Sequence, residues 1–294
     1  MFKSDSAAVG PMPLFNSQQQ TEVDDFLATG KYDNLFELWP GNTFLDRAIT
    51  GTHVLRHALY SEISRRVGPV PISGHCVAAL DIDVRAKFTP MVRGLFSKAE
   101  QPIVLDLLEG SVIFLTPKTI TRALEKTKWL HTAWELANIY LASLNAIPLA
   151  DTDHELVGLS EDTNCFVSMK YFSYDNPFDD YVIHEVAHVF HNCKREGVGL
   201  TGSRRCEWLL EIDYSKRETF AYACEAYSRI LERGGSRLAR ITLLSELANT
   251  AMPPDERVDE VEYMDILQEA VSARNGWKRI LKRCSPVKER PRRA

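Results

Sequence analysis

The stretch YVIHEVAHVFHN, residues 181–192, places three histidines and one glutamate within eight positions of an otherwise apolar run. The spacing of its apolar residues predicts an amphipathic helix. We expect this helix to begin between Phe178 and Tyr181. Either Asp179 or Asp180 can serve as its N-cap, because a short acidic side chain accepts hydrogen bonds from the first free amides of a helix.

The two sides of this helix differ in chemistry. At about 100° per residue, His184, His188 and His191 share one stripe about 60° wide, and Glu185 lies beside them. The other side is apolar and consists of Val182, Val186, Val189 and Phe190. We expect the apolar side to anchor the helix in a core and the imidazole side to face elsewhere.

Residues 184–188 read HEVAH and match the pattern H-E-x-x-H. Two histidines four residues apart on a helix can direct ring nitrogens at one Zn²⁺, with bonds of about 2.0–2.1 Å. The glutamate between them can hydrogen-bond the water at the metal and accept its proton. The motif therefore predicts a zinc site with His184 and His188 as ligands and Glu185 as general base. The alternative is a structural histidine cluster on a partly buried helix.

A third ligand has to come from elsewhere, since a catalytic zinc site has three protein ligands and an open fourth position. His191 lies on the correct face, but three ligands from one straight helix would have to converge across almost two turns. We therefore expect His191 to line the pocket or to lie behind a ligand. The alternative is that it is simply a polar helix end.

A second helix is predicted in KRETFAYACEAYSRILERGG, residues 216–235, with the two glycines as its stop signal. One stripe of this helix carries Glu218, Tyr222 and Glu225, and the other side is apolar. Packed against the first helix, it would place a glutamate over the two imidazoles. The alternatives are that Glu218 is an exposed carboxylate at a helix start and that Glu225 pairs with Arg229.

The HEVAH motif is followed, 30 residues after His188, by the helical sequence RETFA. This arrangement looks like the gluzincin group of zinc metallopeptidases, which take their third ligand from a glutamate on a later helix. Several gluzincin families surround that glutamate with a sequence of the form E-x-F-A. The pair of helices also resembles the regulatory metallopeptidases that cleave bacterial and phage repressors. The similarity covers residues 164–232, under a quarter of the chain.

This resemblance implies a role for each matching residue. Glu218 corresponds to the third zinc ligand, beside the two histidines of the motif. Glu225 is the alternative ligand, or it accepts a hydrogen bond from a liganding imidazole and fixes its tautomer. Apart from the resemblance, the position of Tyr222 on the stripe of Glu218 makes it our first candidate for the donor that stabilises the oxyanion during hydrolysis, and His191 is the second. The metzincin pattern H-E-x-x-H-x-x-G-x-x-H is absent.

Three short stretches are predicted to be strands. NCFVSMKYF, residues 164–172, alternates and contains β-branched and aromatic residues. We expect it to bind an extended peptide by edge pairing, or else to be an internal strand of the sheet. PIVLDLL and SVIFLTP, residues 102–108 and 111–117, are separated by Glu-Gly and predict a hairpin.

Helices are predicted over most of the remaining chain, within residues 21–66, within 117–146 as one or two helices, and in the C-terminal region as two helices split by a Pro-Pro turn. The expected fold class is α+β, mostly helical, with a small zincin-like sheet packed on the HEVAH helix and on the following helix that bears Glu218. The chain divides into a disordered N-terminus (1–20), a helical and β region of unknown role (21–150), a zincin-like catalytic core (151–235), C-terminal helices packed on the core (236–283) and a basic tail (284–294).

The composition limits the kinds of partner. With a net charge of −5, the whole chain has no basic surplus for binding nucleic acid. Residues 274–294 contain nine Lys or Arg and one Glu. We expect a solvated chain end, and the alternative is that this tail alone contacts nucleic acid or an acidic partner. No run has signal-peptide or bilayer-spanning character, and the six cysteines form no C-x-x-C pair. We expect a reduced, cytoplasmic protein without a membrane partner.

These observations together predict a cytoplasmic zinc-dependent metallopeptidase of narrow specificity, with Zn²⁺ as cofactor and a peptide or protein as substrate. Two alternatives keep the metal. One is a hydrolase acting on a non-peptide amide, and the other is a zinc-stabilised binding or regulatory protein without turnover. The sequence leaves the substrate, the cleavage site and the oligomeric state open.

Overall fold

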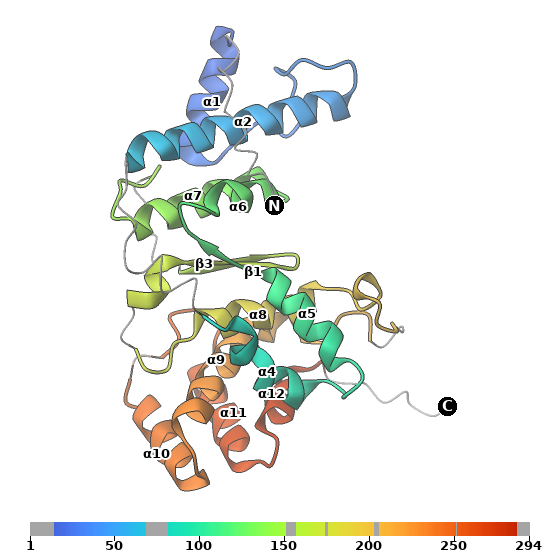
Figure 1. Cartoon of the computed structure of the whole chain (residues 1–294), viewed down its shortest axis with the longest axis vertical. Coiled ribbons are helices and arrows are strands. Elements are labelled where there is room, and N and C mark those ends of the chain that lie inside the picture. The colour runs from blue at the N-terminus through green and yellow to red at the C-terminus, as the bar shows by residue number, and fades with distance from the viewer. Residues whose placement is uncertain are drawn as a thin grey trace, which may run out of the picture.

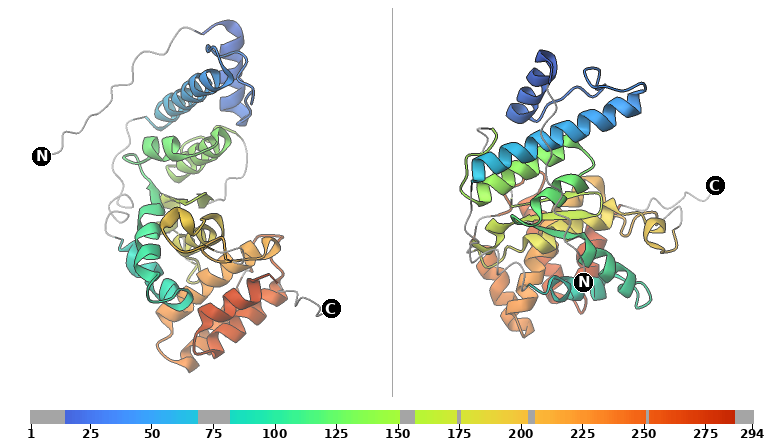
Figure 2. Two further views of the ribbon diagram at one scale, coloured as in Figure 1. Left: turned by 90° about the vertical axis from the view of Figure 1, so that its right-hand side faces the viewer. Right: turned by 45° about the horizontal axis from the view of Figure 1, so that its top comes forward.

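The computed structural model describes residues 15–68, 82–150, 157–173, 176–202, 206–250 and 252–286. Helices dominate, and a three-stranded mixed sheet lies between two helical layers (Figure 1). The molecule is elongated, with the first two helices at one end and the last three at the other (Figure 2). The prediction of a mostly helical α+β fold with a small sheet is confirmed.

The sheet has the order β1-β3-β2 and consists of β1 (Val112–Leu115), β3 (Asn164–Ser168) and β2 (Gly158–Glu161). β1 runs parallel to β3, and β2 runs antiparallel to it. Both edges of β3 are therefore occupied, and the prediction that residues 164–172 offer a free edge to a peptide is wrong. The strand is also shorter than predicted, because Met169–Ser173 form a 3₁₀ turn, η1.

The side chains of β3 alternate between two hydrophobic cores, as the period of a strand requires. Phe166 packs into the upper core, between the sheet and the N-terminal helices. Cys165 and Val167 pack into the lower core, between the sheet and the C-terminal helices. The helices of the upper layer are α1 (Ser17–Thr29), α2 (Phe44–Val67), α6 (Ile120–Lys126) and α7 (Leu130–Ser143).

The predicted histidine helix is α8 (Tyr181–Asn192), which begins where expected, with Asp180 as its N-cap. The predicted anchor residues are all fully buried: Val182, Val186, Val189 and Phe190. The predicted second helix is α9 (Arg217–Arg233), which ends at Gly234 and packs along α8. Two 3₁₀ turns, η2 (Glu196–Val198) and η3 (Tyr214–Lys216), lie between these two helices in the chain.

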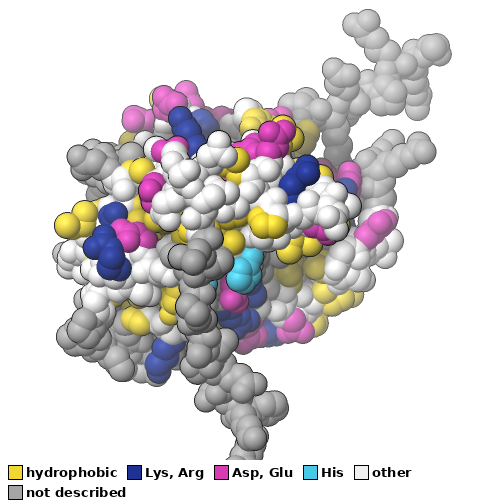
Figure 3. Space-filling model, turned by 90° about the horizontal axis from the view of Figure 1, so that it is seen from above, with side chains coloured by type: hydrophobic (Ala, Val, Ile, Leu, Met, Phe, Trp, Pro, Cys, Tyr) yellow, Lys and Arg dark blue, Asp and Glu magenta, His cyan; other side chains and the backbone are white. Residues whose placement is uncertain are grey.

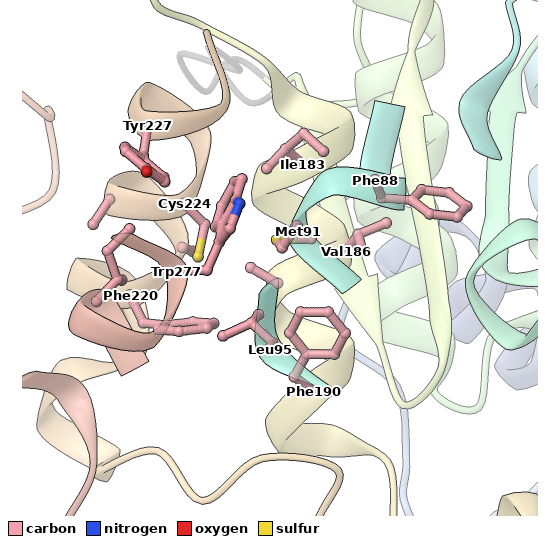
Figure 4. Close-up of a cluster of buried hydrophobic side chains, with 14 of the residues drawn as sticks. Phe88, Met91, Leu95, Ile183, Val186, Phe190, Phe220, Cys224, Tyr227 and Trp277 are labelled. Carbon is pink, nitrogen blue, oxygen red and sulfur yellow. The ribbon is translucent and has the colours of Figure 1, made fainter. Parts of the chain in front are cut away.

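In the lower core, α8 and α9 pack against helices that precede them in the chain and helices that follow them. Besides α8 and α9, the lower layer contains α4 (Val84–Leu95), α5 (Gln101–Ser111), α10 (Arg237–Leu247), α11 (Glu260–Ser272) and α12 (Gly276–Cys284). Figure 4 shows Met91 of α4 and Trp277 of α12 meeting the apolar faces of α8 and α9. This packing holds the two helices of the candidate site at a fixed distance.

The predicted hairpin over residues 102–108 and 111–117 is wrong. Only its second half contains a strand, β1, because the first half lies in α5. Val104 and Leu108 lie four residues apart and are both buried, which is the spacing of one helix face. Pro102 lies in the first turn of α5, where a missing amide breaks no helical hydrogen bond.

The predictions for the two ends of the chain also need correction. Residues 17–20, assigned to a disordered N-terminus, form the first turn of α1, where Asn16 and Gln19 make a capping box. The C-terminal region contains three helices rather than two, because Asn275 caps the separate helix α12. Residues 1–14 and the end of the predicted basic tail lie outside the described residues.

The surface shows no single dominant charge on the face that Figure 3 presents, where the described acidic and basic side chains are interspersed. Among the described residues, no helix is both long enough and apolar enough to cross a membrane.

Candidate metal centre

Three side chains from α8 and α9 converge with the spacing of metal ligands. The Nε2 atoms of His184 and His188 lie 3.2 Å apart. Oε2 of Glu218 lies 3.6 Å from the first of these nitrogens and 3.5 Å from the second. Tetrahedral zinc with bonds of about 2.0–2.1 Å separates its donor atoms by about 3.4 Å. The three residues therefore form a donor set into which a zinc ion fits.

Glu225 lies behind this donor set rather than in it. Its Oε2 is 3.2 Å from Nδ1 of His184, the ring nitrogen that points away from Glu218. Its Oε1 accepts a hydrogen bond from the backbone amide of Asp180, at 2.6 Å. Asp180 is itself fully buried and paired with Lys87 at 2.5 Å. The arrangement suits a carboxylate that holds the proton on Nδ1 of His184 and leaves Nε2 free to bind a metal.

His191 lies behind His188, the second histidine of the donor set. Its Nε2 is 3.4 Å from Nδ1 of His188, and its side chain is only 4% exposed. Burial, together with His188 and Arg217, lowers the pKa of His191 to about 3, so its ring is neutral and can accept a hydrogen bond from His188. The sequence predicted that His191 lines the pocket or lies behind a ligand, with a polar helix end as the alternative. The structure places His191 behind His188 and in the wall of the cavity that the donor set faces.

The charges at the centre favour a cation. Burial lowers the pKa of His184, but its contacts with Glu218 and Glu225 outweigh burial and raise the pKa to about 10. Burial also opposes ionisation of Glu218, yet the two imidazoles hold its pKa far below the usual range. Without a metal, a proton on His184 supplies the positive charge that the two carboxylates require.

Glu185 is held beside the donor set by β2. Its side chain is 6% exposed, and its Oε2 accepts a hydrogen bond of 2.5 Å from Ser160 Oγ. Gly158 lies against the same carboxyl group, where a Cβ atom would approach Oε1 to 2.6 Å. With His184, His188 and other residues, Glu185 lines a cavity of about 760 Å³. The carboxylate is thus positioned at the wall of the space that the metal ligands face.

Arg257 also contributes to the site. Its Nη2 lies 3.2 Å from Oε1 of Glu218, the oxygen that is not directed at the imidazoles. Asp255 pairs with the same guanidinium, at 2.9 Å from Nε and 2.5 Å from Nη2. Arg257 therefore orients the carboxylate of Glu218 from the open side of the cavity, where its own side chain is 64% exposed.

Tyr222 lies one turn after Glu218 and packs against His184. Its ring centroid is 4.4 Å from that of His184, with an angle of 71° between the planes. Its hydroxyl has no hydrogen-bond partner among the described residues. Burial and the nearby carboxylates, Glu225 first, raise the pKa of Tyr222, so the hydroxyl keeps its proton and can donate it in a hydrogen bond.

Three residues of the site were not predicted from the sequence: Gly158, Ser160 and Arg257. The first two lie on β2, a strand that was not predicted, although Asp162 and Thr163 form a two-residue connection to the predicted strand β3. A two-residue connection is typical of a hairpin, so this segment was the signal from which β2 could have been predicted. Arg257 follows Glu218 by 39 residues, in the loop before α11, and carries no local pattern.

Comparison of the chain with models of protein families, with curated proteins and with solved structures finds no match. The function of the protein is therefore inferred from the geometry and chemistry of the centre.

Proposed function

We propose that this protein is a cytoplasmic zinc-dependent metallopeptidase of narrow specificity. The observation that carries the proposal is the triangle of Nε2 of His184, Nε2 of His188 and Oε2 of Glu218, with edges of 3.2, 3.5 and 3.6 Å. Support also comes from Glu225, because a metal-ligating histidine usually donates its second ring proton to a carboxylate or carbonyl. The five described cysteines are free thiols, which suits a reducing compartment.

His184, His188 and Glu218 would hold the zinc ion, which would act as a Lewis acid and lower the pKa of a water molecule to about 7. Glu185 accepts the proton of the attacking water and passes it to the departing amine. Ser160 positions Glu185 through the hydrogen bond to Oε2. The Tyr222 hydroxyl donates a hydrogen bond to the oxygen on which negative charge develops, and His191 keeps His188 oriented from behind.

The substrate approaches along β2 in this proposal. Among the described strands, β2 lies at one edge of the sheet, and its residues Gly158 and Ser160 contact Glu185. An extended peptide that pairs with this edge would carry its backbone past the general base. β2 thereby takes the role that the sequence assigned to residues 164–172. Contact of the basic C-terminal tail with nucleic acid stays the alternative to a solvated chain end.

Glu185→Gln separates hydrolysis from metal binding, because Glu185 is not in the donor set. Wild type and variant are incubated with a mixture of peptides of defined sequence, and the products are identified by mass spectrometry. We expect the wild type to cleave peptides in a zinc-dependent manner and the variant to retain zinc but lose cleavage. Equal cleavage by both proteins would exclude the proposed mechanism. Absence of cleavage by zinc-loaded wild type would favour a zinc-stabilised binding protein.

A further inference from the structure

A second cavity lies on the other side of His184. It has a volume of about 450 Å³ and shares His184, Glu185 and Tyr222 with the cavity that the ligands face. A group in the second cavity would therefore lie next to the proposed reaction centre. Its apolar walls are formed by Phe178, Ala226, Leu247, Met252, Pro253 and Pro254.

Apart from His184, the charged side chains that line this cavity are acidic. Asp179, Glu185 and Glu225 are present, and the described lining residues include no lysine or arginine. The segments that flank the lining residues in sequence, 151–156 and 174–175, contain no lysine or arginine either. The cavity therefore has more acidic than basic side chains, and its one basic group, the His184 imidazole, is already paired with Glu218 and Glu225.

Asp179 is the acidic residue of this cavity that takes no part in the metal centre. Its Oδ1 accepts a hydrogen bond of 2.6 Å from Asn176, and its Oδ2 accepts a bond of 3.4 Å from Tyr181. Burial and the Glu225 carboxylate raise the pKa of Asp179 to about 6, and the hydrogen bond from Tyr181 and the charges of Arg229 and His184 only partly offset them. The Arg229 guanidinium is bound to the Pro177 carbonyl and to Glu232 instead.

Two tyrosine hydroxyls of the cavity, those of Tyr263 and Tyr222, are also available to a ligand. Tyr263 is 3% exposed and lines the cavity, yet its hydroxyl has no hydrogen-bond partner among the described residues. The Tyr222 hydroxyl is likewise unpartnered there. Phenolic oxygens accept hydrogen bonds, and aromatic faces attract cations. The rings of Phe178 and Tyr181 add to this character. The cavity thus combines acceptors, negative charge and aromatic surface.

We propose that this cavity binds the basic side chain of a substrate residue next to the bond that is cleaved, with arginine preferred over lysine. The identity of the ligand as a substrate residue rests on the proposed peptidase function. The preference for a basic side chain rests on the cavity alone. The apolar walls suit the methylene stem of such a side chain. Asp179 and the Tyr263 oxygen accept hydrogen bonds from its head group. A planar guanidinium offers five donors and stacks on aromatic rings, which favours arginine.

Binding of a side-chain analogue tests the cavity without any hydrolysis. The probes are n-butylguanidinium and its uncharged isostere n-butylurea, measured by isothermal titration calorimetry with the protein as purified. We expect butylguanidinium to bind at least about tenfold more tightly than butylurea, a difference of about 1.4 kcal/mol. The preference should fall in Asp179→Asn and, less strongly, in Tyr263→Phe. Asp106→Asn removes one exposed charge from α5 and should leave the preference unchanged.

Cleavage of matched peptides tests the role in specificity. Peptides that differ only in arginine or its neutral isostere citrulline at one position are compared with wild type and Asp179→Asn. We expect the ratio of kcat/KM for arginine over citrulline to fall about tenfold in the variant.

The two experiments separate the two claims. Equal binding of butylurea and butylguanidinium, or an unchanged preference in Asp179→Asn, would overturn the assignment of the cavity. Binding of butylguanidinium by a zinc-loaded protein that cleaves no peptide would overturn the peptidase function and the substrate assignment, and would leave a guanidinium-binding cavity.

Discussion

Replacing Glu225 by glutamine tests whether this centre is built around a metal. Oε2 of Glu225 faces Nδ1 of His184 at 3.2 Å, and Oε1 accepts the amide of Asp180 at 2.6 Å. A carboxylate can accept both hydrogen bonds, but a glutamine has one accepting and one donating end. Whichever way the new amide is placed, one donor therefore faces another donor.

We expect Glu225→Gln to bind zinc more weakly than the wild type because of this conflict between donors. When the glutamine oxygen stays on the buried amide of Asp180, its NH₂ group meets Nδ1 of His184. The imidazole then carries its proton on Nε2, the atom directed at Glu218 and at the metal position. Loss of the partner behind a metal-ligating histidine typically costs about 10–100-fold in affinity, or about 1.4–2.7 kcal/mol.

Zinc affinity is measured by competition with a fluorescent chelator at fixed pH. Glu232→Gln is the matched control, because Glu232 lies on the same helix but pairs with Arg229 at the surface. The control should change zinc affinity by less than about twofold. Circular dichroism establishes that each variant is folded. A folded Glu225→Gln protein with the zinc affinity of the wild type would refute the role given to Glu225 and the assignment of His184 Nε2 as a ligand.

Three further predictions follow from individual contacts. Gly158→Ala should displace the Glu185 carboxyl and lower kcat at least about tenfold with zinc retained, and unchanged kcat would refute the close approach of β2. Phe190→Ala should lower the free energy of unfolding by about 3–5 kcal/mol in urea titrations, because the ring is fully buried, and a loss below 1 kcal/mol would contradict this packing. Asp179 has a raised pKa of about 6 against 3.8, so its ionised form destabilises the fold above pH 6 and not below pH 4. After allowance for partial exposure, Asp179→Asn should therefore stabilise metal-free protein by about 1 kcal/mol at pH 7.5 and not at pH 4, and equal effects at both would contradict the shift.

Local periodicity was sufficient to predict the two helices of the site. The alternation of apolar and polar faces in α8 follows from one turn per 3.6 residues, so the burial of Val186 and Phe190 could be read from the sequence. The same rule placed Glu218 and Tyr222 on one stripe of α9. It could not decide between Glu218 and Glu225, because both lie on that stripe and only the crossing of α8 and α9 determines which oxygen meets Nε2 of His184.

Contacts between segments far apart in the chain could not be predicted from the sequence. Ser160 reaches Glu185 because β2 is antiparallel to β3 at one edge of the sheet, which no pattern in residues 158–161 specifies. Arg257 reaches Glu218 from a loop whose course depends on the packing of α10 and α11. The predicted hairpin was wrong for a different reason. Residues 102–108 have the composition of a strand, but their buried residues have the spacing of a helix face, and the helix forms.

The zinc content of wild type and Glu218→Gln tests the central claim most directly. Both proteins are reconstituted with zinc, freed of unbound metal by gel filtration and analysed by inductively coupled plasma mass spectrometry. Because Glu218 Oε2 completes the donor set with His184 and His188, wild type should retain about one equivalent of zinc and the variant much less. Less than half an equivalent in wild type, or equal retention by both proteins, would contradict a metal centre formed by these three residues.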